Sequence, residues 1–346
     1  MIGTPLAIDI GPGAIAALAP LLADRRISSG GHVAVAVGPG QGAEIAEVLR
    51  PQLAHADILR VDDGSVEEAS ALAKRLRAGF YDAIVGIGGG KVLDTAKYAA
   101  SLSGLPMVAV ATSLAHDGLA SPVASLTEGG RKMSFGVQMP IAVVVDLDYV
   151  RRSAPEMRRS GIGDAVSNLS AIADWELAGR ERGEEVDGLA VTFARTGAMG
   201  VIDRTDTIDD DAFLYALADA LVLGGLAMAV AGSSRPCSGA DHEILHAIDH
   251  LFPGTASHGE LAGLGALFAC HLRGDAELTA HLAACLVRHG LPCVPEEAGL
   301  TREQFADAVA HAPSTRPDRY TILEHLALSA EEVRARVDAF ADALDR

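Results

Sequence analysis

The chain has 346 residues and a formal net charge of −18 at pH 7, and 49% of its residues are hydrophobic. This length exceeds what one hydrophobic core ordinarily supports, so we expect two domains. The negative charge disfavours nucleic acid and membrane surfaces as partners. The four cysteines form no CxxC pair and no secretory signal is recognisable, so we expect a protein of the reducing cytoplasm.

Short β-like runs alternate with amphipathic helical runs up to residue 145, which predicts a parallel sheet with crossover helices. The predicted strands are 6–10, 32–37, 57–61, 83–87, 107–110 and 141–145, and the predicted helices are 40–49, 66–78 and 91–101. A Gly129-Gly130 pair indicates a hairpin. We place the last strand, 141–145, at an edge of the sheet.

Strand signals fade after residue 150, and helical runs follow one another to the end of the chain. The predicted helices are 163–178, 188–201, 212–231, 241–251, 259–272, 276–289, 302–310 and 330–344. The predicted fold is therefore an α/β nucleotide-binding domain over 1–150 and an all-helical domain over 151–346. The run 213–232 is long enough to span a bilayer, but it contains Asp219 and lacks a basic flank, so we expect a buried helix.

A glycine-rich loop, Gly88-Gly89-Gly90, lies between a predicted strand and a helix. Glycines let the backbone approach a diphosphate, and a helix N-terminus offers N–H groups and a positive dipole. Lys91 stands where the dinucleotide motif has its last glycine, and Val92 stands where the Walker A motif has Ser or Thr. Two interpretations of this loop remain open: it binds the phosphates of a cofactor, or it is an ordinary tight turn.

A second polar loop follows the next strand and contains Thr112, Ser113 and Asp117. Loops at the carboxyl ends of strands form the usual ligand crevice of open α/β sheets. These side chains could hold a nicotinamide amide or a ribose. The alternative is a polar loop in which Asp117 caps a turn or a helix.

The helical part carries a candidate metal site. His242 and His246 lie four residues apart on one predicted helix face, and His258 opens the next segment. With Asp164 as the best third ligand, two imidazoles and one carboxylate would leave an open coordination position, which is typical of catalytic sites. Three alternatives stay open: Asp164 as a helix N-cap, His242 as a core histidine, and a Ser257–Glu260 capping box that fixes His258.

Four segments together resemble a known family. They are GIGGGKVLDTAK from Gly86, SLAHDGLASPVASL from Ser113, GIGDAVSNLSAIADWELA from Gly161, and SSRPCSGADHEILHAID with SHGELAGLG. The chain resembles the iron-containing alcohol dehydrogenase-like superfamily, with its dehydroquinate synthase-like fold, and within it the glycerol-1-phosphate dehydrogenases. The family often has Pro at position 111 and Glu at position 241, where this chain has Ala111 and Asp241.

The resemblance implies the following site residues. The metal, zinc or iron(II), would be bound by Asp164, His242 and His258. The cofactor, NAD or NADP, would contact Gly88, Gly89, Gly90, Lys91, Asp94, Thr112, Ser113, Asp117 and Ser121. The substrate would contact Asp117, Asn168, Arg235 and His246, of which Asp117 and His246 are candidates for proton transfer. Arg235 could instead be a helix-terminus residue.

The implied reaction is a reversible reduction of dihydroxyacetone phosphate, or a closely related small polyol phosphate, by NAD(P)H. No acidic residue follows the strand that ends at Val37, so we expect NADP to be tolerated. The alternatives are a sugar-phosphate cyclase similar to dehydroquinate synthase, a glycerol-type dehydrogenase acting on an unphosphorylated polyol, and an inactive regulatory protein. Asp164 with Ser167 and Asn168 favours the dehydrogenase branch. We expect a homo-oligomer.

Overall fold

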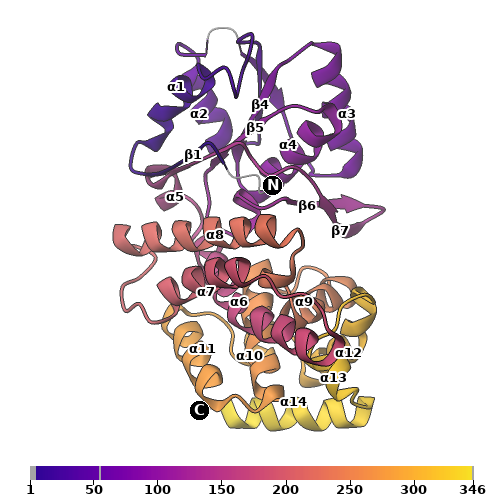
Figure 1. Cartoon of the computed structure of the whole chain (residues 1–346). Helices are drawn as coiled ribbons and strands as arrows, with labels where there is room; N and C mark the ends of the chain where they lie inside the picture. The colour runs from indigo at the N-terminus through magenta and orange to yellow at the C-terminus, as the bar shows by residue number, and fades with distance from the viewer. Residues whose placement is uncertain (1–4, 54–55, 345–346) are drawn as a thin grey trace. The chain divides into compact units, whose positions relative to one another are not determined.

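A computed structural model describes residues 5–53 and 56–344. The chain divides into two compact units, Met1–Ala154 and Pro155–Arg346. Figure 1 shows the first unit in indigo and purple and the second from magenta to yellow. Parts of the predicted domains, namely 1–4, 54–55 and 345–346, lie outside the described residues.

The first unit is built on a six-stranded parallel sheet with the strand order β1-β8-β5-β4-β2-β3. The strands are β1 (Ala7–Gly11), β2 (Val33–Val37), β3 (Asp57–Arg60), β4 (Ala83–Gly88), β5 (Met107–Ala111) and β8 (Ala142–Asp146). The parallel α/β prediction is confirmed. The edge position predicted for 141–145 is wrong, because β8 pairs with both β1 and β5. All five residues of β8 are buried, as expected for a central strand of a parallel sheet.

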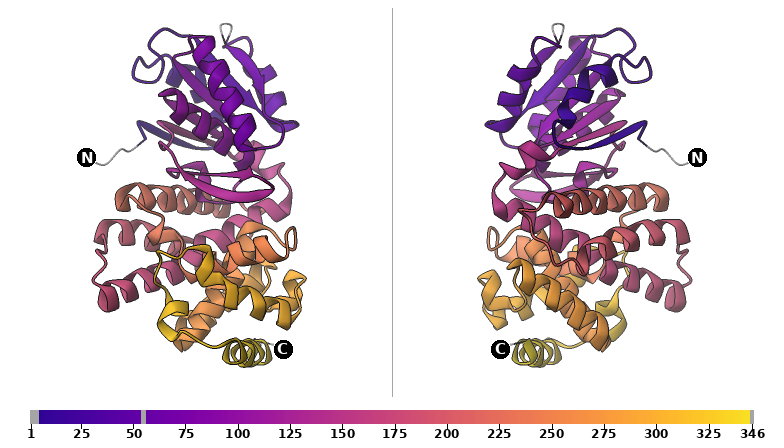
Figure 2. Two further views of the ribbon diagram at one scale, coloured as in Figure 1. Left: turned by 90° about the vertical axis from the view of Figure 1, so that its right-hand side faces the viewer. Right: turned by 90° about the vertical axis from the view of Figure 1, so that its left-hand side faces the viewer.

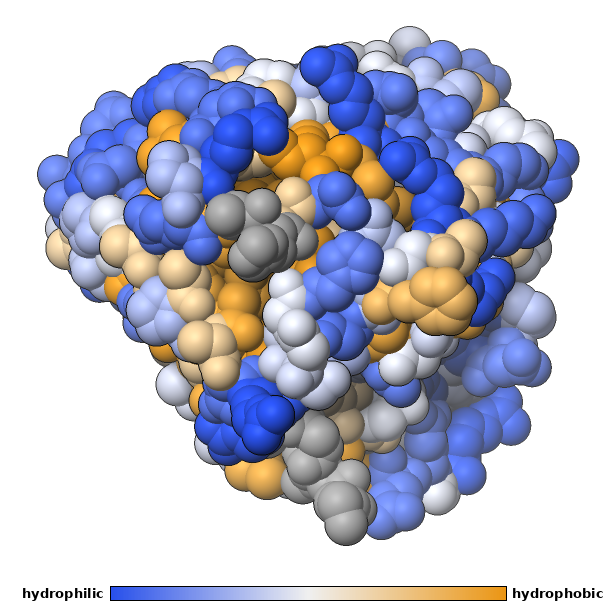
Figure 3. Space-filling view, turned by 90° about the horizontal axis from the view of Figure 1, so that it is seen from above, coloured by the Kyte–Doolittle hydropathy of each residue, from blue (hydrophilic) through white to orange (hydrophobic). Residues whose placement is uncertain are grey.

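Helices cover both faces of this sheet. They are α1 (Leu18–Leu22), α2 (Gln41–Leu49), α3 (Val66–Ala78), α4 (Gly90–Ser103) and α5 (Leu147–Arg151). Two short 3-10 helices are η1 (Ala14–Ala17) and η2 (Asp117–Leu119). Figures 1 and 2 show α1 and α2 on one face and α3 and α4 on the other. The end of this unit seen in Figure 3 is mostly hydrophilic, with apolar residues showing between the polar ones.

The predicted hairpin is confirmed. It joins β6 (Val123–Glu128) to β7 (Arg131–Gly136), which pair in antiparallel register. Gly129 and Gly130 both have positive φ, 57° and 80°, which is the requirement of the two-residue turn that matches the twist of a hairpin. The hairpin connects the polar loop after β5 to β8.

The described residues of the second unit contain helices and no strand. The helices are α6 (Pro155–Arg182), α7 (Gly188–Ile202), α8 (Asp211–Ala231), α9 (Ala240–Leu251), α10 (His258–Arg273), α11 (Ala276–His289), α12 (Arg302–His311), α13 (Ile322–Leu326) and α14 (Ala330–Leu344), with 3-10 helices η3 (Arg235–Cys237), η4 (Pro295–Ala298) and η5 (Ala312–Thr315). The prediction of an all-helical second part is confirmed. α13 was missed because five residues are too few to show a helical period.

α8 corresponds to the long apolar run. By length and composition it is the one described helix that could cross a bilayer, but 61% of its apolar window is buried inside the protein. α8 packs along α7, and its buried residues include Phe213, Leu217 and Leu221. This burial is the property expected of a core helix.

Two glycines set the separation of α6 and α10. A Cβ at Gly163 would overlap the carbonyl oxygen of Gly259, and a Cβ at Gly259 would overlap the carbonyl oxygen of Ser160. The Gly259 amide donates to Ser160 Oγ over 3.0 Å. The absence of side chains at both positions therefore lets the two helix backbones touch where α10 begins.

A buried ion pair holds the same two helices further along. Arg273 of α10 contacts Asp174 of α6, with 2.5 Å between Nη2 and Oδ1, and it donates to the Ser170 hydroxyl over 3.0 Å. Asp174 also accepts from the amides of Ala240 and Ile322, at 2.8 Å each. One carboxylate thus fixes the first residues of α9 and α13 against α6.

Replacing Gly259 with Ala should destabilise the protein by about 1–3 kcal/mol, because the added methyl group must displace the Ser160 backbone. Gly200→Ala is the matched control. Gly200 is exposed within α7, and an added Cβ meets nothing within 4 Å, so this change should be neutral or stabilising. Chemical unfolding of both variants checks the prediction, and equal stabilities would contradict it.

Candidate metal centre and cofactor loops

The structure brings together the three predicted metal ligands. Asp164 lies inside α6, His242 in the first turn of α9, and His258 at the first position of α10. One ligand atom from each residue lies within 4.8 Å of the others. The Nε2 atoms of His258 and His242 lie 3.3 Å and 3.8 Å from Asp164 Oδ1.

The local structure explains these positions. α6 begins at Pro155 rather than at Gly163, because proline is well suited to the first turn of a helix. The N-cap alternative for Asp164 is therefore wrong, since this residue lies well inside α6. The predicted capping box of Ser257 and Glu260 is present and fixes the first turn of α10, which carries His258.

The residues present fit a divalent metal ion. Ligand atoms about 2.1 Å from a tetrahedral zinc ion lie about 3.4 Å from one another. The two measured separations to Asp164 Oδ1 are close to this value. In addition, the buried Nδ1 of His242 faces Asp241 Oδ2 at 3.4 Å. A carboxylate behind a histidine is a common way to orient a metal ligand.

Other predicted substrate residues lie on the same helices. Asn168 is buried on α6, four residues after Asp164 and so on the same helix face. His246 lies one turn after His242 on α9, with 6.3 Å between the ring centroids. Burial, followed by the charge of Arg316, holds the pKa of His246 well below its usual value, so this ring is neutral at pH 7.

Two arginines near His246 were missed by the sequence reasoning. Arg316 donates to His246 Nε2 over 2.9 Å and to the Ser234 hydroxyl over 3.3 Å. Arg319 donates to the same hydroxyl over 3.0 Å and to the carbonyl of Ser238. They lie in the run TRPDRY, about seventy residues after His246. Nothing in that run matches a recognised motif, so only the fold shows their proximity.

Arg235 has a different environment from the one predicted. Its guanidinium contacts Glu184 through both Nε and Nη2, with 2.6 Å from Nε to Oε1, and it donates to the Tyr320 carbonyl over 3.1 Å. This paired arrangement connects the end of α6 to the segment before α13. The predicted contact of Arg235 with substrate stays a prediction, and the structure gives this residue a structural role as well.

The cofactor loops are close together in the first unit. Gly88 ends β4, and its carbonyl accepts from the amide of Thr112, which follows β5, over 3.0 Å. A Cβ at Gly89 would lie 3.1 Å from Ser113 Oγ. The glycine-rich loop and the polar loop therefore meet at the carboxyl ends of neighbouring strands, where open α/β sheets bind ligands.

His116 lies over the glycine-rich loop and was given no role by the sequence reasoning. A Cβ at Gly90 would overlap His116 Nε2, and His116 Nδ1 accepts from the Gly118 amide over 3.0 Å. Because Nδ1 accepts, the neutral ring carries its proton on Nε2, beside the start of α4. The run AHDG was visible in the sequence, but no spacing rule indicated that this ring folds back.

A buried lysine organises the polar loop. Lys97 Nζ lies 2.9 Å from Asp94 Oδ1, and it donates to the carbonyls of Gly118, Ser121 and Val123, at 2.6 Å and 3.4 Å for the first two. Asp94 also accepts from the Ser125 amide over 3.2 Å. Asp94 and Ser121, both predicted to contact cofactor, are thus structural partners of Lys97.

Lys91 and Asp117 complete the predicted set. A Cβ at Gly64 would lie 2.5 Å from Lys91 Cγ, so the lysine stem passes beside the loop after β3. Asp117 is the first residue of η2, capped by His116. Their predicted contacts with cofactor and substrate stay predictions.

Comparison with known proteins identifies the family. The profile of the family described as iron-containing alcohol dehydrogenase matches residues 9–155. A glycerol-1-phosphate dehydrogenase [NAD(P)+] of Archaeoglobus fulgidus is 39% identical over 292 residues, which is 82% of this chain and 82% of the relative. The chain belongs to the glycerol-1-phosphate dehydrogenase family. A relative of the same name from Thermofilum pendens is 41% identical over 78% of this chain and 77% of its own length.

Solved structures agree on the fold. A probable glycerol dehydrogenase of Sinorhizobium meliloti has a TM-score of 0.78 at 22% identity and covers 100% of this chain and 99% of its own. An iron-containing alcohol dehydrogenase of Thermococcus thioreducens has a TM-score of 0.72 at 16% identity, covering 98% of each chain. The predicted family, fold class and oxidoreductase class are confirmed.

Removing a metal ligand should abolish tight metal binding. We expect wild-type protein to bind one zinc ion per chain, and His258→Ala and Asp164→Asn to lose that ion on dialysis. Asp241→Asn should weaken zinc binding by about 10–100-fold, because it changes the group behind His242. Elemental analysis and calorimetry measure these effects. The control is His281→Ala, at an exposed position of α11. Stoichiometric zinc in all the variants would contradict the assignment.

Replacing Lys97 with Met should destabilise the protein by about 3–5 kcal/mol, because it leaves the Asp94 charge buried and unpaired. The double variant Lys97→Met/Asp94→Leu should recover part of that loss. Lys74→Met, at an exposed position of α3, should change stability by less than about 0.5 kcal/mol. Denaturant unfolding compares the four proteins, and a Lys97→Met protein as stable as Lys74→Met would overturn the account of the loop.

Proposed function

We propose that this protein catalyses the reversible reduction of dihydroxyacetone phosphate to sn-glycerol-1-phosphate with NADH or NADPH. The observation that carries the proposal is the cluster of Asp164, His242 and His258 in a chain of the glycerol-1-phosphate dehydrogenase family. The same family membership favours a dehydrogenase over the cyclase and the inactive regulatory protein considered from the sequence.

We assign Asp164, His242 and His258 to metal binding, with zinc as the expected ion and iron(II) as the alternative. When bound, the metal would polarise the ketone oxygen and the nicotinamide would supply the hydride. The chain's own contribution is to fix the ligands. The α6–α10 backbone contact positions His258 beside Asp164, and Asp241 Oδ2 lies 3.4 Å from Nδ1 of His242, where a carboxylate can orient a metal-binding ring.

The reduction also needs a proton at the ketone oxygen. Asp117 and His246 remain the candidates for its delivery. His246 is the candidate that lies beside the metal ligands of its own unit, and its Nε2 accepts from Arg316. With Nε2 engaged, a neutral His246 carries its proton on Nδ1. We therefore assign any donation by His246 to Nδ1, with a proton from solvent restoring the neutral ring after the transfer.

The cofactor loops support binding of a dinucleotide. Gly88, Gly89 and Gly90 leave the start of α4 without side chains, where the helix N-terminus favours a phosphate. The loop after β2 consists of Gly38, Pro39 and Gly40 and carries no carboxylate to bind a ribose 2′-hydroxyl. We therefore propose that both NADH and NADPH serve, in line with relatives that are named glycerol-1-phosphate dehydrogenase [NAD(P)+].

Two further expectations concern the protein in the cell. We propose a homo-oligomer, because the helical unit exposes several large apolar side chains, among them Met157, Leu189, Met199 and Val287. The cytoplasm remains the expected location. Four buried free cysteines fit a reducing compartment.

The proposal is tested by following NADH and NADPH oxidation with dihydroxyacetone phosphate and with dihydroxyacetone, on zinc-loaded and on chelator-stripped protein. We expect zinc-dependent turnover of the phosphate ester, with chiral analysis giving sn-glycerol-1-phosphate. Turnover of dihydroxyacetone alone would indicate a glycerol-type dehydrogenase instead. Turnover of neither ketone would contradict the proposed function.

A further inference from the structure

The two arginines beside His246, Arg316 and Arg319, lie on the segment 312–321, which packs against α9. η5 packs against α9, and Arg316 directly follows η5. Thr321, two residues after Arg319, donates to Glu243 Oε2 over 3.0 Å. Both ends of the segment 312–321 are therefore attached to the helix that carries His242 and His246.

These half-buried arginines differ from Arg235 and Arg273 of the same unit in what they contact. Arg235 contacts Glu184 and Arg273 contacts Asp174, so each of those charges is matched by a carboxylate. Within residues 5–53 and 56–344, neither Arg316 nor Arg319 has a carboxylate within ion-pair distance. Their guanidinium groups contact one imidazole nitrogen, one shared hydroxyl and one carbonyl.

The pair is also electrostatically strained. Burial, followed by the nearby charges of Arg316 and Arg235, lowers the pKa of Arg319 to about 10. Burial likewise lowers the pKa of Arg316. Asp241 and Glu243 on α9 offset only part of this effect. Two guanidinium groups that share the Ser234 hydroxyl form a site where an anion would relieve the repulsion.

The arginine pair lies close enough to the proposed metal ligands for the anion to be part of the substrate. Arg316 contacts His246, and the ring of His246 lies 6.3 Å from the ring of His242, a proposed metal ligand. If the ketone oxygen of a small substrate faces the proposed metal ligands, the other end of that substrate lies beside His246. The guanidinium groups of the arginine pair lie next to that end. Arginine is the residue best suited to a phosphate, because its N–H groups form a planar fork that binds two oxygens.

We propose that Arg316 and Arg319 bind the phosphate group of the substrate, with His246 and Ser234 as positioning residues that hold the two guanidinium groups. This inference rests on the proposed function and deepens it. The arginine pair would make the protein select a phosphate ester over the corresponding bare ketone. Arg235, whose charge is already matched by Glu184, would not take this role.

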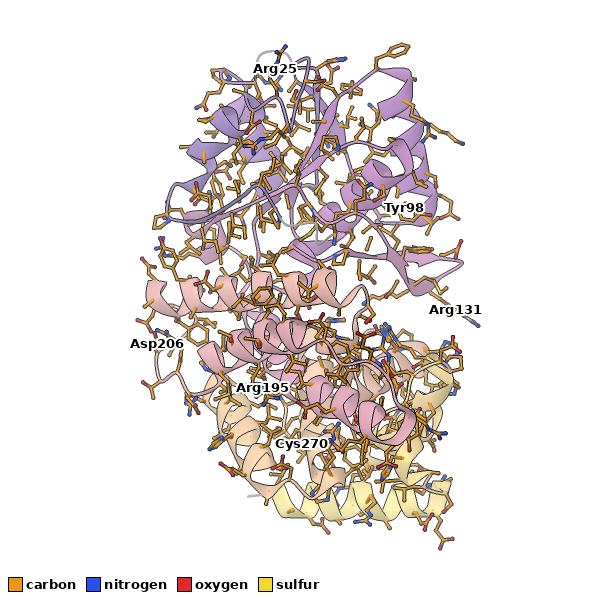
Figure 4. All side chains as sticks on the ribbon, in the orientation of Figure 1. Arg25, Tyr98, Arg131, Arg195, Asp206 and Cys270 are labelled. Carbon is orange, nitrogen blue, oxygen red and sulfur yellow. The ribbon has the colours of Figure 1, made fainter. Side chains whose placement is uncertain are left out.

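The kinetic test uses the zinc-loaded full-length variants Arg316→Gln, Arg319→Gln and Arg319→Lys. The matched control is Arg195→Gln, which removes an exposed arginine paired with Glu176 in the same unit (Figure 4). We expect KM for dihydroxyacetone phosphate to rise by about 10–100-fold in each Gln variant, because a charge-assisted hydrogen bond is lost. KM for dihydroxyacetone should change by less than about threefold, Arg319→Lys should recover part of the loss, and Arg195→Gln should match wild type.

A binding test separates this inference from the proposed function. Calorimetric titration of chelator-stripped protein with inorganic phosphate should show binding to wild type and to Arg195→Gln, and about tenfold or weaker binding to Arg316→Gln and Arg319→Gln. Unchanged phosphate binding, or an unchanged KM for the phosphate ester, in both Gln variants would overturn the inference. If wild type binds phosphate through these arginines but reduces no phosphorylated ketone, the proposed function fails and the anion site stands.

Discussion

The contact between the backbones of α6 and α10 is the constraint on which the candidate site depends. Gly163 and Gly259 let a carbonyl oxygen of one helix take the space that a methyl group would occupy on the other. This contact places Asp164 and His258 3.3 Å apart at their ligand atoms. Ten residues along α6, Asp174 fixes the first amide of α9 and so the helix that supplies His242. The three proposed ligands, one from each of three helices, thus depend on one glycine contact and one buried carboxylate.

The net charge of the protein differs in sign from the local charge beside the candidate site. A net charge of −18 would repel a phosphorylated substrate at long range. The helical unit contains two half-buried arginines without a carboxylate partner among the residues that the structure describes, one side chain away from the proposed metal ligands. Local desolvated charge outweighs distant solvated charge, because water and salt screen the surface carboxylates. The proposed anion site is therefore compatible with the acidic net charge of the protein.

The sequence predicted most of the fold, because the helical and strand periods are long and regular in both parts. It also predicted that Asp164, His242 and His258 lie close together, because the motifs around these residues are specific. Metal binding by the three residues stays a prediction. It missed the place of β8 in the centre of the sheet, since a buried strand looks the same at either position. It missed Arg316 and Arg319, because their contacts join residues about seventy positions apart in the chain. It missed His116, because this ring folds back over the glycine-rich loop. It also could not show that Glu184 pairs with Arg235, because the two residues lie about fifty positions apart in the chain.

The most direct test of the account is an anomalous-difference map from crystals of zinc-loaded protein, recorded on either side of the zinc absorption edge. We expect a peak for one ion bound by Asp164 Oδ1 and by the Nε2 atoms of His242 and His258, with an open coordination position. A zinc peak at other residues, or no ordered zinc at these three ligands, would contradict it.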